Sequence, residues 1–131
     1  MKPSDANLGE QYEKRIKVRE AMQAYRYLRE HATRLEGYRC FPHIQGYIPS
    51  FRYLRGSAWP FGFIVNQKSL LFYIRKAGLS HPAADAKALR KVFAEVIENK
   101  RGEIKIRITS LADAERLTAL LLDSSWNGAP A

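Results

Sequence analysis

Residues 103–109 alternate between two kinds of side chain at every step. Isoleucine fills every second position, and charged or polar residues fill the others. A period of two is typical of a β-strand that is buried on one face and exposed to solvent on the other. Because isolated strands and hairpins are at best marginally stable, we expect this segment to belong to a sheet whose isoleucine face is covered. The opposite face would then carry Lys105 and Arg107.

Three further strands are predicted from short runs of β-branched and aromatic residues. They span Phe51–Leu54, Phe61–Asn66 and Ser69–Lys76. A tight turn at residues 66–68 joins the last two. The preceding segment, 38–50, contains Pro42, Gly46 and Pro49, which favour an irregular connection over regular structure.

Three helices are predicted. The first is one long helix over residues 9–35, where helix formers dominate, no proline interrupts and Gly37 follows as a stop. The second covers residues 82–98, in which five apolar residues recur at helical spacing. The third begins at Ser110, which can form a capping box with Asp113.

The resulting order is α-β-β-β-α-β-α, and a chain of 131 residues has the size of a single domain, 1–131. We therefore expect an α+β fold. A long N-terminal helix would precede an antiparallel β-meander and a helix-strand-helix unit, with the helices mainly on one face of the sheet. Residues 1–8 and 124–131 are expected to be flexible termini, although Trp126 offers an apolar group that could dock.

The elements from about residue 51 to 126 have a recognisable order. They are the hairpin 61–76, a helix, the strand 102–108, and a helix that ends in Leu-Leu-Leu-Asp-Ser-Ser-Trp126. This order, together with a few apolar positions, resembles the MmcQ/YjbR-like domains, and the long N-terminal helix lies outside the resemblance. Those domains are small bacterial α+β proteins often described as DNA-binding, so the resemblance implies that fold and a DNA-binding role.

The segment 37–84 contains no aspartate and no glutamate over 48 residues, where the chain's 13 acids in 131 residues predict about five. Six cations and ten of the 15 aromatic residues lie in the same segment. Cations interleaved with rings, without carboxylates to neutralise them, suit a polyanion whose bases can stack. The net charge of +9 also favours an anionic partner.

The sequence therefore predicts a non-enzymatic protein that binds nucleic acid, either DNA or RNA. The basic residues expected to contact phosphates are Arg39, Arg52, Arg55, Lys68, Arg75, Lys105 and Arg107. The aromatic residues expected to offer stacking or wedge surfaces are Tyr47, Tyr53 and Trp59. The same cations could instead dock an acidic protein surface, so a protein-interaction module remains the alternative.

Catalytic chemistry has little support in the sequence, and we expect no catalytic residues, cofactor or metal. Glu103 and Lys105 share a strand face as in metal-dependent nucleases, but the hairpin strands supply no aspartate to complete that site. Cys40 and His43 have a zinc-like spacing, yet two ligands do not make a site. A small metal-independent ribonuclease that uses His43 and Tyr47 is the third hypothesis.

The chain is expected to be cytoplasmic. Its N-terminal region is polar and lacks the apolar core of a signal peptide, and no apolar run is long enough to span a membrane. Tyr12, Ile16 and Tyr25 of the first predicted helix could form a homodimer contact. Its many i,i+4 ion pairs favour a solvated face instead.

Overall fold

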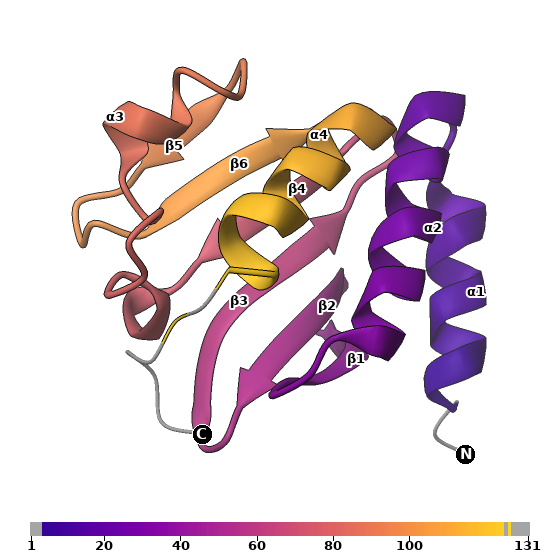
Figure 1. Cartoon of the computed structure of the whole chain (residues 1–131). Helices are drawn as coiled ribbons and strands as arrows, with labels where there is room; N and C mark the ends of the chain where they lie inside the picture. The colour runs from indigo at the N-terminus through magenta and orange to yellow at the C-terminus, as the bar shows by residue number, and fades with distance from the viewer. Residues whose placement is uncertain (1–3, 125, 127–131) are drawn as a thin grey trace.

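The computed structural model describes residues 4–124 and 126. Its centre is an antiparallel sheet of six strands in the spatial order β1-β2-β3-β4-β6-β5 (Figure 1). The strands are β1 (Arg39–Gln45), β2 (Ile48–Arg55), β3 (Ala58–Val65), β4 (Leu70–Ile74), β5 (Val96–Glu98) and β6 (Ile104–Ile108). Strands β1 to β4 follow one another as hairpins, whereas β6 pairs with β4 and leaves β5 at the edge.

The helices cover one side of this sheet. They are α1 (Asp5–Arg15), α2 (Arg19–Arg34), α3 (Ala86–Leu89) and α4 (Leu111–Leu117), and α4 continues as a π-helical turn over Thr118–Leu122. Helices α2 and α4 lie side by side across one face, and α1 lies beside α2 (Figure 1). The expected α+β fold, with helices mainly on one face of an antiparallel sheet, is confirmed.

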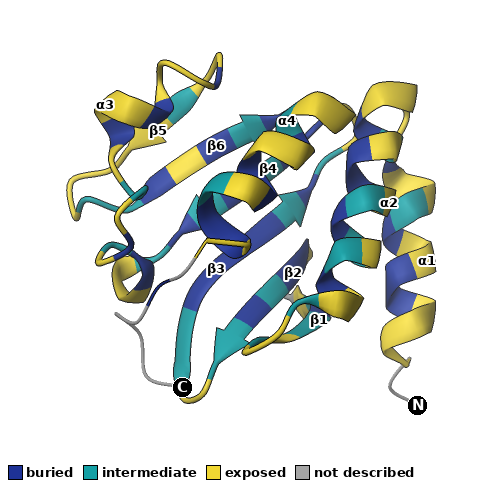
Figure 2. Cartoon of the chain, viewed as in Figure 1, coloured by how far each residue is buried: buried dark blue, intermediate teal, exposed yellow. Residues whose placement is uncertain are grey.

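The core lies between these helices and the sheet, as the buried strand positions in Figure 2 show. Phe61, Phe63 and Phe72 are fully buried there, and Tyr25 of α2 meets Phe63 edge to face with ring centroids 6.2 Å apart. The predicted alternation of β6 is confirmed, because its three isoleucines are at most 1% exposed while Lys105 is exposed.

The N-terminal segment forms two helices, so the prediction of one long helix is wrong. Helix α1 ends at Arg15, and Ile16 has an extended backbone with φ −77° and ψ 127°. The backbone N–H of Lys17, which follows the end of α1, donates to Gln67 O at 2.6 Å. This hydrogen bond connects the break between the helices to the β3–β4 turn. The reversal lets both helices bury their apolar sides, and Tyr25 Oη donates to Gly9 O at 2.7 Å between them.

This packing also removes the expected dimer contact. Tyr12, Ile16 and Tyr25 are 3%, 5% and 0% exposed within the chain's own core. A second subunit therefore cannot use these side chains without opening the core. The expected flexible segment 1–8 overlaps α1, because Asp5–Leu8 belong to its first turn and Leu8 is 5% exposed.

The segment 38–50 is not an irregular connection. It contains β1 and the start of β2, joined by a turn in which Gly46 has φ +63°. Both prolines are tolerated for reasons of position. Pro42 lies on an edge strand, and Pro49 precedes Ser50, where the pairing of β2 with β3 begins.

The predicted helix over residues 82–98 is also wrong. Only α3 forms, and the chain then extends into β5, which pairs with the outer edge of β6 through Val96 and Ile106. Leu89 and Phe93 are buried as the helical spacing predicts, but Val92 and Ile97 are 40% and 48% exposed. The open edge of β6 offers backbone hydrogen bonds that a longer helix would leave unmade.

At the C-terminal end, Trp126 is 5% exposed and packs against Phe61 and His81, with ring centroids 5.5 and 5.3 Å away. The rest of the expected flexible segment lies outside the described residues, apart from the exposed Ser124. Among the helices described, none is long and apolar enough to cross a membrane.

Candidate nucleic-acid interface

The sheet has a second face, which looks away from α1, α2 and α4. Arg52, Gly62, Tyr73 and Lys105 lie in register across β2, β3, β4 and β6. Their core-facing neighbours in the sequence are buried, so their side chains point to the other side. We call this surface the open face and define it by Arg52, Trp59, Gly62, Tyr73, Arg75, Lys105 and Arg107.

Two arginines stack on Trp59, at the end of the open face where β3 begins and β4 ends. The central guanidinium carbon of Arg52 lies 3.8 Å from the ring centroid, and that of Arg75 lies 3.6 Å from it. The arginines come from β2 and from the end of β4, the strands on either side of β3, so each takes one face of the indole. Cation–π contacts of this kind contribute roughly 0.5–2 kcal/mol each and hold both guanidiniums in place.

Tyr73 completes this cluster. Its ring meets Trp59 edge to face at 6.1 Å, and its side chain crosses β3 above Gly62, where a Cβ would overlap the phenol. Burial raises the pKa of Tyr73 to about 12, against the opposing effect of Arg52 and Arg75. The phenol therefore remains neutral at physiological pH.

The two cations of β6 differ. Lys105 is exposed, at the position directly opposite Tyr73. Arg107 is engaged: its Nε donates to Glu95 Oε2 at 2.5 Å and its Nη1 donates to Ser69 Oγ at 2.8 Å. Lys105 is therefore accessible for the phosphate contact predicted for it. Arg107 is less available for such a contact, because it is already paired with Glu95 and Ser69.

Arg55 does not belong to the open face. It lies three residues from Arg52 on an alternating strand, so its guanidinium turns to the helix side and lies 5.7 Å from the Tyr38 ring and 5.3 Å from the Trp126 ring. There it lines a cleft of about 540 Å³ together with His31 and Asp123. The structure does not bring Arg55 together with Arg52.

The three aromatic residues predicted to stack on bases differ in how exposed their rings are. Tyr53 is 0% exposed in the core, so its prediction as a stacking surface is wrong. Trp59 lies on the open face, but both faces of its ring are covered by arginines, so it does not offer a plane for a base. Tyr47 is 99% exposed at the β1–β2 turn, between Ile44 and Ile48, which are about half exposed.

The remaining predicted cations lie at the periphery. Arg39 is exposed on the edge strand β1, with its guanidinium carbon 5.6 Å from the Phe41 ring. Lys68 is exposed in the turn between β3 and β4. Both can extend the positive surface, but neither contacts the Trp59 cluster.

Cys40 and His43, the pair with a zinc-like spacing, do not come together in a metal site. Cys40 pairs with Tyr53 on the helix side of β1, whereas His43 lies an odd number of residues away and points to the other side. Burial also raises the pKa of Cys40 to about 12, which disfavours a thiolate ligand. Within residues 4–124 and Trp126, no cluster of three or more potential metal ligands occurs.

Glu103 and Asp85, the two acids nearest to a nuclease pattern, serve local structure. Glu103 Oε1 accepts from Asn99 Nδ2 at 2.9 Å, and this hydrogen bond is the main reason that its pKa lies below the ordinary value. Asp85 caps α3 by accepting from the backbone N–H of Lys87 at 3.1 Å. Each carboxylate is hydrogen-bonded within its own segment of the chain, and the two do not form a shared metal site.

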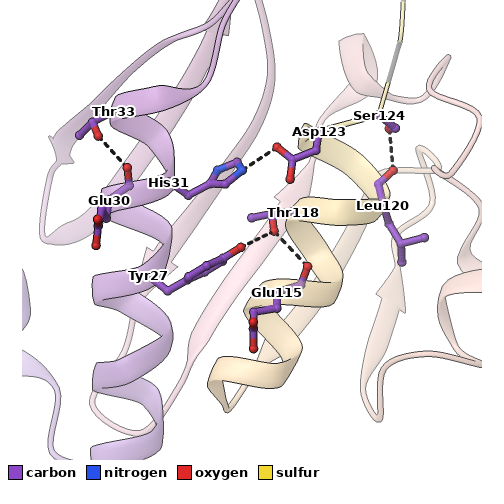
Figure 3. A network of polar contacts seen from close by, with 9 residues as sticks. All are labelled: Tyr27, Glu30, His31, Thr33, Glu115, Thr118, Leu120, Asp123 and Ser124. Carbon is purple, nitrogen blue, oxygen red and sulfur yellow. Dashed lines mark hydrogen bonds and ion pairs between the residues drawn. The ribbon is translucent and has the colours of Figure 1, made fainter.

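A polar network that the sequence did not predict joins α2 to α4 (Figure 3). Tyr27 Oη and Thr118 Oγ1 lie 3.0 Å apart, and Thr118 in turn donates to Glu115 O, so Tyr27 is the donor. His31 Nε2 lies 2.7 Å from Asp123 Oδ1. These contacts hold the two helices over the sheet.

The nearby His81 and Ser124 do not form a nucleophilic pair. His81 Nδ1 accepts from the backbone N–H of Ala83 at 2.9 Å, so the proton of a neutral ring is on Nε2. That nitrogen lies 3.0 Å from Ser124 Oγ and donates to it, while Ser124 donates to Leu120 O. A ring that donates to the hydroxyl cannot remove its proton.

No protein-family model matches this chain, and neither a curated protein nor a solved structure shows detectable similarity to it. The resemblance to the MmcQ/YjbR-like domains stays a prediction from element order.

Proposed function

We propose that this protein binds nucleic acid, DNA or RNA, through the open face of its sheet, as a non-enzymatic protein of the cytoplasm. The observation that carries this proposal is the stack of Arg52 and Arg75 on Trp59, with the exposed Lys105 across the same face. Strands β1 to β4 contribute no carboxylate to this surface, and the carboxylates beside it are Glu95, which pairs with Arg107, and Glu103, which lines a pocket with Trp59 and Arg75. A positive, uncovered face of this kind attracts a phosphate backbone.

The chemistry of a stacked guanidinium supports phosphate as the ligand group. Stacking uses the flat face of the guanidinium, whereas its N–H donors lie in the plane of the group. Two such donors held by one ring lose little side-chain entropy when they bind a phosphate. Such contacts give little specificity for the base sequence of the ligand, because phosphate contacts position a nucleic acid without identifying its bases.

An acidic protein partner is the second candidate. The observation that favours it is the exposed apolar tip of the β1–β2 hairpin, formed by Ile44, Tyr47 and Ile48. Apolar side chains beside a positive face are common where proteins dock. Short oligonucleotides would not compete effectively with a partner that also buries this tip.

Fluorescence anisotropy with labelled DNA and RNA, at about 50 mM salt and upward, tests the nucleic-acid proposal. We expect the logarithm of the affinity to fall linearly with the logarithm of the salt concentration. Lys105→Glu should weaken binding about tenfold for every sequence, because it replaces attraction by repulsion at a phosphate contact. The control is Arg34→Glu, which makes the same charge change on α2, at a side chain that is 70% exposed on the helix side.

The control variant should bind nearly as well as the parent. Absence of binding to any nucleic acid at low salt would refute the proposal, as would equal loss of affinity in the two variants.

A further inference from the structure

We infer that the open face takes single-stranded nucleic acid in preference to a duplex, and that Trp59 acts as a positioning residue that holds Arg52 and Arg75 against the phosphates of that strand. This inference rests on the proposed function and specifies its ligand. It departs from the sequence prediction, in which Trp59 itself would stack on a base.

The width of the sheet argues against a duplex groove. Six strands spaced by about 4.8 Å span about 24 Å, twice the width of about 12 Å of a major groove. The cation cluster lies on the inner strands β2 to β4, not on a protruding edge. A duplex can touch such a surface with one phosphate ridge only, whereas a flexible single strand can follow it.

The surroundings of the cluster suit bases that are not stacked inside a helix. Ile64 and Leu71 face each other across β3 and β4 on the open face, and both are half-buried. Phe41, opposite Arg52 on β1, is half-buried as well. Apolar side chains beside phosphate-binding cations form the combination that proteins use for single strands, because unpaired bases need apolar surface and paired bases do not.

The geometry of the cluster defines the role of Trp59. Both guanidiniums lie against one ring at 3.8 and 3.6 Å, so they stand close enough for neighbouring phosphates of one chain. With both faces occupied, the indole has no plane left for a base. Without the ring, two long side chains of like charge would separate and lose the common orientation that the stack imposes.

The test compares a labelled single strand of about 12 nucleotides with its duplex, by anisotropy over a salt series. The proteins are the parent, Trp59→Leu, Trp59→Phe and Lys105→Glu. We expect the single strand to bind at least about tenfold more tightly than the duplex. Trp59→Leu should lower its affinity about tenfold and flatten the salt dependence by about one released ion, and Trp59→Phe, which keeps a ring, should restore most of both.

The salt slope separates positioning from simple loss of structure. A partly unfolded variant binds with fewer active molecules but with an unchanged slope, and circular dichroism reports unfolding directly. If Trp59→Leu does not fold, Arg75→Lys serves in its place, because it keeps the charge and gives up the flat stack, and the same loss of affinity and slope is expected.

The outcomes distinguish this inference from the proposed function. If the duplex binds as tightly as the single strand and Lys105→Glu weakens both, nucleic-acid binding stands and the single-strand inference is overturned. If Trp59→Leu keeps the parent's affinity and slope while Lys105→Glu loses affinity, the positioning role is overturned. If neither ligand binds, the proposed function itself fails.

Discussion

The phenol of Tyr73 occupies the space where a side chain on Gly62 would begin. The two residues face each other directly on β4 and β3, and a Cβ at position 62 would overlap the Tyr73 hydroxyl and lie 2.7 Å from Phe51 O. Glycine at this strand position is therefore required by a close approach and not by backbone conformation. The approach brings Tyr73 against Trp59, so the packing of the arginine–tryptophan stack depends on a missing side chain.

The first prediction follows from that contact. Gly62→Ala should destabilise the protein by about 1–3 kcal/mol, because the added methyl group forces Tyr73 and the Phe51 carbonyl aside. Urea unfolding of the single variant, of Tyr73→Phe and of the double variant measures the coupling. We expect the double variant to recover part of the loss, since removing the hydroxyl relieves one of the three overlaps, while those with Tyr73 Cζ and the Phe51 carbonyl oxygen remain. Full additivity of the two changes would contradict the contact.

The second prediction concerns the two faces of β6. Ile106 is 0% exposed in the core, so Ile106→Ala should cost about 2–5 kcal/mol. Lys105→Ala, at the neighbouring exposed position, should cost less than about 0.5 kcal/mol. Denaturant unfolding of both variants checks the difference. Equal stability of the two would mean that the facing of this strand is wrong.

The third prediction separates Arg52 from Arg55, which a sequence argument groups together. Arg52→Gln should weaken nucleic-acid binding, because it removes one cation of the Trp59 stack, and loss of that contact should also lower the melting temperature. Arg55→Gln should lower the melting temperature without changing the affinity, since Arg55 packs against Tyr38 and Trp126 on the other side of the sheet. Anisotropy measures the affinity of both variants, and thermal melts measure their stability. If both variants lose affinity, the assignment of binding to the open face is wrong.

The fourth prediction is a pH dependence of stability that comes from His81. Burial lowers the pKa of His81 in the folded protein, whereas the unfolded chain titrates near the ordinary value of 6.5. The unfolded state therefore takes up the proton first as the pH falls, and the stabilising contribution is complete above about pH 6.5. It is lost as the pH falls through this value towards the lowered folded pKa.

Urea midpoints measured between about pH 8 and pH 5 test this dependence. His81→Gln should reduce the slope, because the amide cannot titrate in this range. His43→Gln, at a half-buried site on β1, is the matched control and should retain the slope that His81 contributes. A parent protein whose stability is constant over the range would contradict the prediction.

Some of this structure could be predicted because the responsible signal is local. The alternation at residues 103–109 is visible in the sequence, and it correctly separates buried Ile106 from exposed Lys105. The same reasoning, applied along β2, would have separated Arg52 from Tyr53 and Arg55. This alternation along β2 is present in the sequence, but the charge and aromatic content of residues 37–84 does not distinguish the two faces of a strand.

Other features depend on contacts that no local pattern records. The break between α1 and α2 is held by a hydrogen bond from Lys17 to Gln67, fifty positions along the chain. The apolar residues that fit a helix after α3 instead meet the open edge of β6, and that edge exists only once the sheet has formed. The Trp59 stack likewise joins three strands, so the sequence could identify its members but not their arrangement.

The two edges of the sheet have a consequence for how the molecule behaves in a crowded solution. One edge is β1, which is interrupted by Pro42 and its missing N–H donor, and the other is β5, which has three residues. Neither presents a long, unbroken row of backbone groups to which another copy could add a strand. Strand addition between copies is therefore disfavoured at both edges, which leaves the open face uncovered by such association.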